Sequence, residues 1–140
     1  WIIAVGIVGL SLLILLAAFI YQRVSSPYTP VLHAYMKHMA AKDANGAYEH
    51  FAPTAREHVP LARIERLLEG RNFSNFDGYQ SLKVTSTKVS RHPGAVPEIV
   101  ASVSGTIRYA GGVERMFRAA LTQTNQGWML YTMNIQVPAE

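Results

Sequence analysis

The chain divides into a long apolar run and a longer part in which apolar and polar positions alternate. Residues 1–21 carry no charge, and as a helix rising about 1.5 Å per residue they would span roughly 30 Å, the thickness of a bilayer's apolar core. Trp1 and Tyr21 stand at the two ends, where interfacial aromatic residues belong. The pattern predicts a retained transmembrane helix over residues 1–22 and a connector over residues 23–28. A cleaved signal peptide is the alternative, but its apolar core would be shorter and a small-residue cleavage site would follow it.

Three segments beyond the connector have the apolar spacing of amphipathic helices. The first begins at Thr29, placed as the N-cap, and its apolar stripe runs from Leu32 to Met39. Asp43 can cap a second, short helix that ends at Pro53. A third helix opens at Pro60 and ends near residue 70, which is a glycine. Each has a polar outer face, so all three need an apolar surface to cover.

From residue 82 onwards the apolar period changes to two, which is typical of half-buried strands. An irregular first strand runs to about Val89, and three regular strands follow the loop HPGAVP. A three-residue loop over residues 110–112 predicts that Val103 lies opposite Ala119. A similar loop over residues 125–127 predicts that Leu121 lies opposite Tyr131. The predicted inward positions are Leu32, Tyr35, Met36, Phe51, Val103, Phe117, Leu121, Tyr131, Met133 and Ile135.

Three helices followed by an antiparallel sheet resemble the cystatin-like cone of the nuclear transport factor 2-like superfamily. The segments that carry the resemblance are TPVLHAYMKHMAAKD, AYEHF, LARIERLLEG, FSNFDGYQSL and the closing GWMLYTMNIQV, and together they cover roughly residues 27–137. The last strand looks like that of small bacterial members, some of them membrane-anchored. The resemblance implies a cone with an internal pocket, but no particular reaction. The predicted fold is therefore α+β: an N-terminal transmembrane helix, then a cone-shaped domain over residues 29–138 with about three helices packed on a bent antiparallel sheet of about four strands.

Residues suited to catalysis or metal binding are sparse. The chain has no cysteine, which excludes disulfides, thiolate metal sites and thiol catalysis. Enzymes of the resembled superfamily use an Asp or His base inside the cone, and no predicted inward position is either. Asp77 precedes a glycine and is interpreted as a turn residue, while Arg115 lies near a strand end and can reach solvent. The histidines His33, His38, His50, His58 and His92 have no metal-ligand spacing and are interpreted as solvated. We therefore predict no catalytic residue, no cofactor, no metal and no enzymatic activity.

The charge of the chain is positive but dispersed. The net charge is +4, and the 13 basic residues are interleaved with nine acidic ones. This pattern argues against a nucleic-acid partner and is compatible with weak attraction to anionic lipid headgroups.

Two sets of residues are candidates for binding. Met116, Trp128 and Leu130 are predicted on the outer sheet face, where they would form a protein-docking patch; alternatively, Trp128 covers a loop or the sheet edge. The candidate lining of the internal pocket is Tyr35, Phe51, Phe117, Tyr131 and Met133.

Together these features predict a non-catalytic single-pass membrane protein in the cell membrane, with its domain on the non-cytoplasmic side. It would be an accessory or stabilising subunit of a larger integral-membrane complex, such as an energy-converting one, or form a homodimer. The apolar segment would then be an anchor, or would pack against the larger protein. The alternative is a membrane-tethered module that binds a small apolar ligand in the cone. An enzyme of the isomerase or dehydratase type is a third hypothesis.

Overall fold

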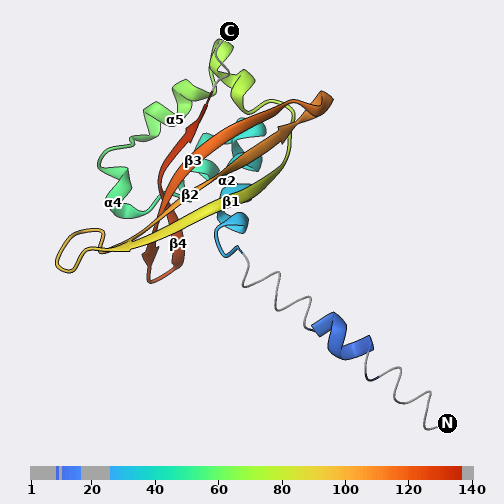
Figure 1. Ribbon diagram of the computed structural model, residues 1–140. Helices are drawn as coiled ribbons and strands as arrows, with labels where there is room; N and C mark the ends of the chain where they lie inside the picture. Colours follow the sequence, from blue (N-terminus) through green and yellow to red (C-terminus); the bar gives the residue numbers. More distant parts are fainter. Residues whose placement is uncertain (1–8, 10, 17–25, 137–140) are drawn as a thin grey trace.

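The computed structural model describes residues 9, 11–16 and 26–136. Residues 26–136 form helices packed on one face of a four-stranded antiparallel sheet (Figure 1). The helices are α2 (Thr29–Ala40), α3 (Ala44–Tyr48), α4 (Pro53–Arg56), α5 (Leu61–Leu67) and the 3₁₀ helices η1 (Gly70–Asn75) and η2 (Ala110–Gly112). The strands are β1 (Tyr79–Arg91), β2 (Ile99–Tyr109), β3 (Glu114–Thr124) and β4 (Gly127–Ile135), in the order β1-β2-β3-β4. The α+β class and the four antiparallel strands are as predicted, whereas about three helices were expected.

The predicted transmembrane helix is corrected by the structure. Within the described residues, no helix is both long and apolar enough to cross a membrane. Residues 11–16 are helical, and the large side chains of residues 12–16 are exposed. The rest of the predicted span and connector, at residues 1–8, 10 and 17–25, lies outside the described residues. The fold class is therefore α+β, taken over residues 26–136.

The end of α2 joins directly to the start of α3. Lys42 has a positive φ of 57°, and the backbone N–H of Asp43 donates to the His38 carbonyl at 2.8 Å, a Schellman-type helix end. Asp43 then caps α3 as predicted, because its carboxylate accepts from the backbone N–H of Gly46 at 3.0 Å. The sequence predicted that this helix ends at Pro53, but it ends at Tyr48. Pro53 instead begins α4, where its missing N–H costs nothing.

The β2–β3 register is the predicted one. Val103 lies opposite Ala119, and the N–H of Tyr109 donates to the Val113 carbonyl at 2.8 Å across the three-residue connection. Gly111 and Gly112 both have positive φ values, of 81° and 77°. A side chain there would be strained, so the two glycines fix this connection and, through it, the register.

The β3–β4 register differs from the prediction near the turn. Thr124 pairs with Gly127, so the connecting loop has two residues instead of three. A β-bulge between the Ala120 and Leu121 positions then inserts one extra residue into β4. The two shifts cancel. Beyond the bulge, the pairing of residue 119 with 133 and of residue 117 with 135 is as predicted, while Leu121 pairs with Leu130 instead of Tyr131.

The core lies between the helices and one face of the sheet. Seven predicted inward residues are buried: Leu32, Tyr35, Met36, Phe51, Val103, Phe117 and Leu121. The other three, Tyr131, Met133 and Ile135, are half-buried and pack against the core. Burying a large apolar side chain contributes about 1.5–3 kcal/mol, so the paired apolar faces account for the packing of α2 on the sheet.

Candidate functional site

The candidate site is a groove beside the last strand. It has a volume of about 260 Å³ and lies between α5 and β4, and we call it the α5–β4 groove. Its lining is Tyr35, Phe51, Val59, Arg63, Ile64, Leu67, Thr132, Met133 and Asn134. Tyr35 and Phe51 pack edge to face, with ring centroids 5.7 Å apart. Burial raises the pKa of Tyr35, so its phenol stays protonated. The lining therefore combines apolar side chains with the polar residues Thr132 and Asn134, and its one charged residue, Arg63 on α5, is exposed.

The groove runs along the outer edge of the sheet. β4 is the last strand in the sheet order, and part of its edge is covered by the chain before α4. There, Leu130 forms a parallel bridge with Phe51. The N–H of Leu130 donates to the His50 carbonyl, and the Leu130 carbonyl accepts from the N–H of Ala52, both at 2.8 Å. Pro53 then turns the chain into α4. From Thr132 onwards, no strand pairs with this edge among the described residues.

Three of the five residues predicted to line a pocket do line this groove. Tyr35, Phe51 and Met133 are part of it, while Phe117 and Tyr131 are not. Phe117 is fully buried in the core. Tyr131 is the extra residue of the β-bulge, so the strict alternation on which its assignment rested breaks at that point. The α5 residues of the groove were not predicted, because their position depends on how α5 packs beside β4.

The predicted docking patch is only partly on the outer face. Met116 is 58% exposed, as expected for that face. Leu130 is fully buried and bridged to Phe51, so the prediction that it points outwards is wrong. Trp128 is half-buried and packs edge to face on Tyr28, with ring centroids 5.1 Å apart. It therefore contacts the core, and the prediction that it points away from the core is also wrong. The two-residue turn moves both side chains to the helix-covered face.

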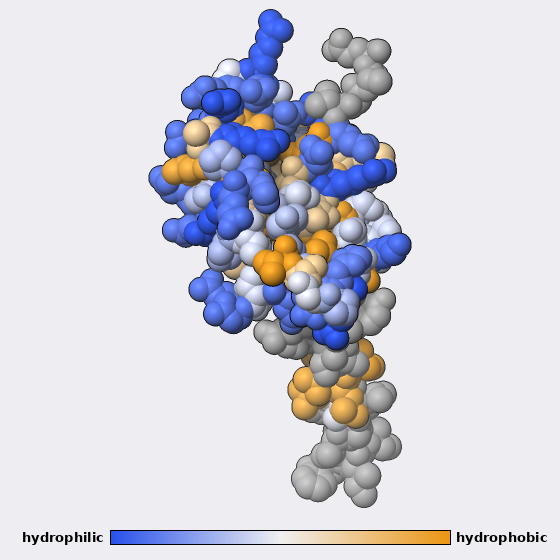
Figure 2. All heavy atoms as spheres, turned by 90° about the vertical axis from the view of Figure 1, so that its left-hand side faces the viewer, coloured by the Kyte–Doolittle hydropathy of each residue, from blue (hydrophilic) through white to orange (hydrophobic). Residues whose placement is uncertain are grey.

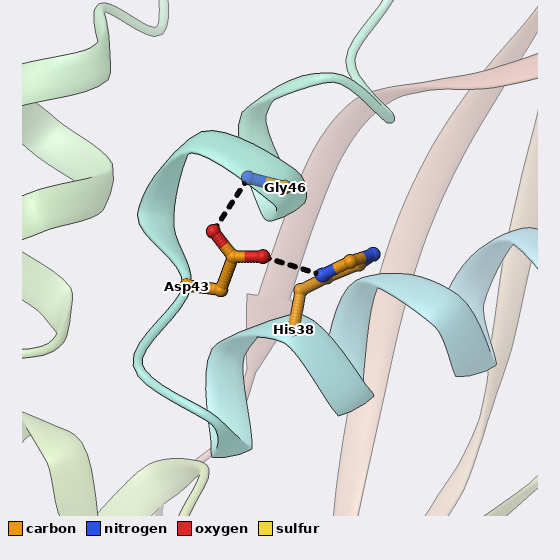
Figure 3. A network of polar contacts seen from close by, with 3 residues as sticks. All are labelled: His38, Asp43 and Gly46. Atoms are coloured by element: carbon orange, nitrogen blue, oxygen red, sulfur yellow. Dashed lines mark hydrogen bonds and ion pairs between the residues drawn. The ribbon is translucent and has the colours of Figure 1, made fainter.

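A polar cluster that was not predicted lies where α2 meets α3 (Figure 3). His38 Nδ1 lies 3.0 Å from Asp43 Oδ2, and the other carboxylate oxygen caps Gly46. The ring of His50 lies 5.2 Å from that of His38. Gly46 permits this approach, because a Cβ there would come within 2.4 Å of the His38 ring. The sequence missed the cluster because the contact depends on the left-handed residue Lys42, which no motif signals.

The electrostatics of this cluster indicate a capping role. The backbone N–H of Gly46, followed by the His38 hydrogen bond, lowers the pKa of Asp43. Burial, followed by the charge of His38, lowers the pKa of His50. An Asp–His pair can act as a general base, but the side chains of His38 and Asp43 are 40% and 47% exposed. Neither residue lines the α5–β4 groove. The pair is therefore largely exposed and lies outside that groove.

A second polar cluster lies where β1 begins and β2 ends. His33 Nδ1 lies 2.6 Å from the Tyr79 hydroxyl, and the Tyr109 hydroxyl donates to the Asn75 carbonyl. Arg115 donates to the Asn75 side chain at 2.7 Å, and its buried Nε has no hydrogen-bond partner in the described part of the chain. Arg115 is half-buried, so its side chain still reaches solvent in part while its guanidinium contacts Asn75. Burial raises the pKa of Tyr79 to about 12, so this phenol is a neutral group near pH 7 and cannot act as a base.

Further hollows lie elsewhere on the domain, and two of them are larger than the groove. One of about 530 Å³ lies between α4, the loop before β2 and the β3–β4 turn, and includes Arg56, Glu98, Thr122 and Met129. The other, of about 480 Å³, lies on the outer sheet face and includes Lys88, Ser102, Arg118 and Asn134. Seen from the side that is on the left in Figure 1, hydrophobic residues are scattered among hydrophilic ones over the domain (Figure 2). They form no single large patch in that view.

The chain matches no protein-family model, and no curated protein is similar to it at a significant level. The resemblance to the nuclear transport factor 2-like superfamily stays a prediction. Within residues 9, 11–16 and 26–136, no three histidine, cysteine, aspartate or glutamate side chains are placed to hold a metal ion.

Proposed function

We propose that the chain is a non-catalytic accessory module that binds another protein through the α5–β4 groove. The observation that carries this proposal is that the groove adjoins an edge of β4 with which no strand in the described part of the chain pairs beyond Thr132. A strand edge with unpaired backbone groups is a ready template for another chain, and buried aromatic and aliphatic side chains beside it offer anchoring contacts.

The size of the groove favours a protein partner over a small ligand. Small-molecule sites are usually clefts or cavities of about 300–1,000 Å³, whereas this groove is smaller, at about 260 Å³, and lies beside the last strand of the sheet. A recess of that size suits one or two side chains of a partner that lies along the edge. The accessory role in a larger complex, predicted from the sequence, is compatible with such a contact.

The test is purification of the full chain with a matched pair of charge reversals. Arg63 and Arg66 are both exposed on α5, but only Arg63 lines the groove. The tagged chain should retain a stoichiometric protein partner. Arg63→Glu should lose most of that partner, and Arg66→Glu should keep it. A wild-type chain that purifies alone, or equal retention by the two variants, would contradict the proposal.

A small-ligand function has support from a different hollow. The space beside α4 measures about 530 Å³, which lies within the usual range for small-molecule sites. Its lining combines apolar Met129 and Ile99 with charged Arg56 and Glu98. Mass spectrometry of the purified chain under native conditions would test this function. Recovery of a bound small molecule that Met129→Trp displaces would favour it over the protein-binding proposal.

A further inference from the structure

The hydrogen-bond pattern between β3 and β4 determines which backbone groups of β4 point to its free edge. In an antiparallel pair, every second residue directs its N–H and C=O to the partner strand, and the residues between direct theirs away. The N–H of Gln136 donates to the Met116 carbonyl at 2.8 Å. Counting back along β4, Asn134 and Thr132 also face β3. Met133 and Ile135 therefore direct their N–H and C=O groups to the free edge.

The same edge already forms a single β-bridge with an extended segment a few residues earlier. Leu130 exchanges two backbone hydrogen bonds with the chain at residues 50–52, and Pro53 then directs that chain away into α4. This bridge shows that an extended segment can hydrogen-bond to the edge of β4 at Leu130. Next to it, the groove continues past Met133, and the edge groups of Met133 and Ile135 have no backbone partner among the described residues.

The charge of the groove indicates which kind of extended chain would bind there. Its lining contains one cation, Arg63, and no acidic residue. Arg118 lies on the outer face, paired with Asn134 in the register. A second copy of this chain pairing edge to edge would bring only uncharged residues from 131 to 135 and would add its own Arg63 and Arg118. An acidic strand complements the site better than a second copy does.

We infer that the partner binds as an added β-strand on the free edge of β4. Its backbone pairs with Met133 and Ile135, its apolar side chains enter the groove beside Tyr35 and Phe51, and an acidic side chain faces Arg63. Main-chain hydrogen bonds supply affinity in this mode of recognition, and alternate side chains supply specificity. This inference rests on the proposed function and specifies the partner's conformation and charge.

The probe is a synthetic peptide about six residues long, blocked at both ends, in which apolar residues alternate with glutamates. It is added to the full chain in mild detergent, and amide hydrogen exchange is followed by NMR. At a peptide concentration of about ten times Kd, exchange at Met133 and Ile135 should slow about tenfold. Exchange at Thr132 and Asn134 should not change, because their amides are already bonded to β3.

Two altered peptides test the backbone and the charge separately, without risk to the fold. N-methylation of the amides that face β4 should weaken binding at least about tenfold, because it removes donors and adds bulk at the strand edge. Exchanging glutamate for lysine should weaken binding about fivefold, the usual upper range for an exposed ion pair. Arg63→Glu should reverse this preference, and Arg66→Glu should not.

The outcomes separate this inference from the proposed function. Equal binding of the N-methylated peptide, or unchanged exchange at Met133 and Ile135, would overturn strand addition. If the natural partner still depended on Arg63, the proposed function would stand with another bound conformation. If exchange at the same amides slowed with rising protein concentration in the absence of peptide, the edge would bind a second copy of this chain. That result would overturn the inference of an acidic partner. Slowed exchange confined to Met133 and Ile135, lost on N-methylation, would support the inference.

Discussion

Replacement of Phe117 by alanine tests which face of the sheet carries the core. Phe117 is fully buried in the middle of β3, between Gly105 on β2 and Ile135 on β4. Its ring is packed so closely that a Cβ on Gly105 would lie 3.0 Å from it. The surrounding strands are held by their ladders and can collapse only partly. Phe117→Ala should therefore destabilise the domain by about 3–5 kcal/mol, a large fraction of the usual 5–15 kcal/mol.

The measurement is urea unfolding of the full chain in mild detergent, followed by circular dichroism, with thermal melting in parallel. A loss of this size corresponds to a fall in Tm of roughly 10–20 °C for a domain of this length. Met116→Ala is the matched control, because it changes the neighbouring residue of β3, whose side chain is exposed; its effect should stay within about 0.5 kcal/mol. A loss below about 1 kcal/mol for Phe117→Ala, or an equal loss in both variants, would refute the assignment of the two faces.

Three further variants test the packing and the electrostatics. Trp128→Ala should cost about 2 kcal/mol, because the indole is partly buried and packs on a tyrosine ring; an unchanged Tm would contradict this contact. Gly105→Ala should cost at least about 1–3 kcal/mol, since its Cβ would lie 2.0 Å from the Lys83 carbonyl oxygen, and a neutral result in denaturant would disprove that approach. The lowered pKa of His50 means that its stabilising contribution is present above about pH 6.5 and is lost as pH falls through the folded-state value. His50→Gln should flatten the fall in unfolding free energy between pH 7 and about 5.5, and an unaltered slope would exclude His50 as its source.

The parts of the fold that the sequence predicted are those that local chemistry determines. Two adjacent glycines fix the β2–β3 connection, and Asp43 caps α3 in the expected way. In β4, by contrast, apolar side chains occur at both even and odd positions, so either parity could face the core. A turn shorter by one residue and a compensating bulge at Tyr131 decide between them. Neither has a sequence signal as strong as a glycine pair, and Leu130 was therefore placed on the wrong face.

Only some of the residues that line the candidate site could be predicted from the sequence. Tyr35, Phe51 and Met133 follow from the inward positions of their own elements. Arg63 depends on where α5 packs relative to β4, which is a long-range contact that periodicity does not encode. The uncovered edge is likewise a consequence of strand order. Sequence patterns thus identify groove-lining side chains without indicating that backbone donors and acceptors lie beside them.

The most direct test of the central claim is amide hydrogen exchange in the full chain, purified with its natural partner and compared with the same chain after the partner has been removed. The proposed strand addition predicts that Met133 and Ile135 exchange more slowly in the complex, while Thr132 and Asn134 exchange equally in both samples. Exchange at Met133 and Ile135 that stays the same with the partner bound would contradict it.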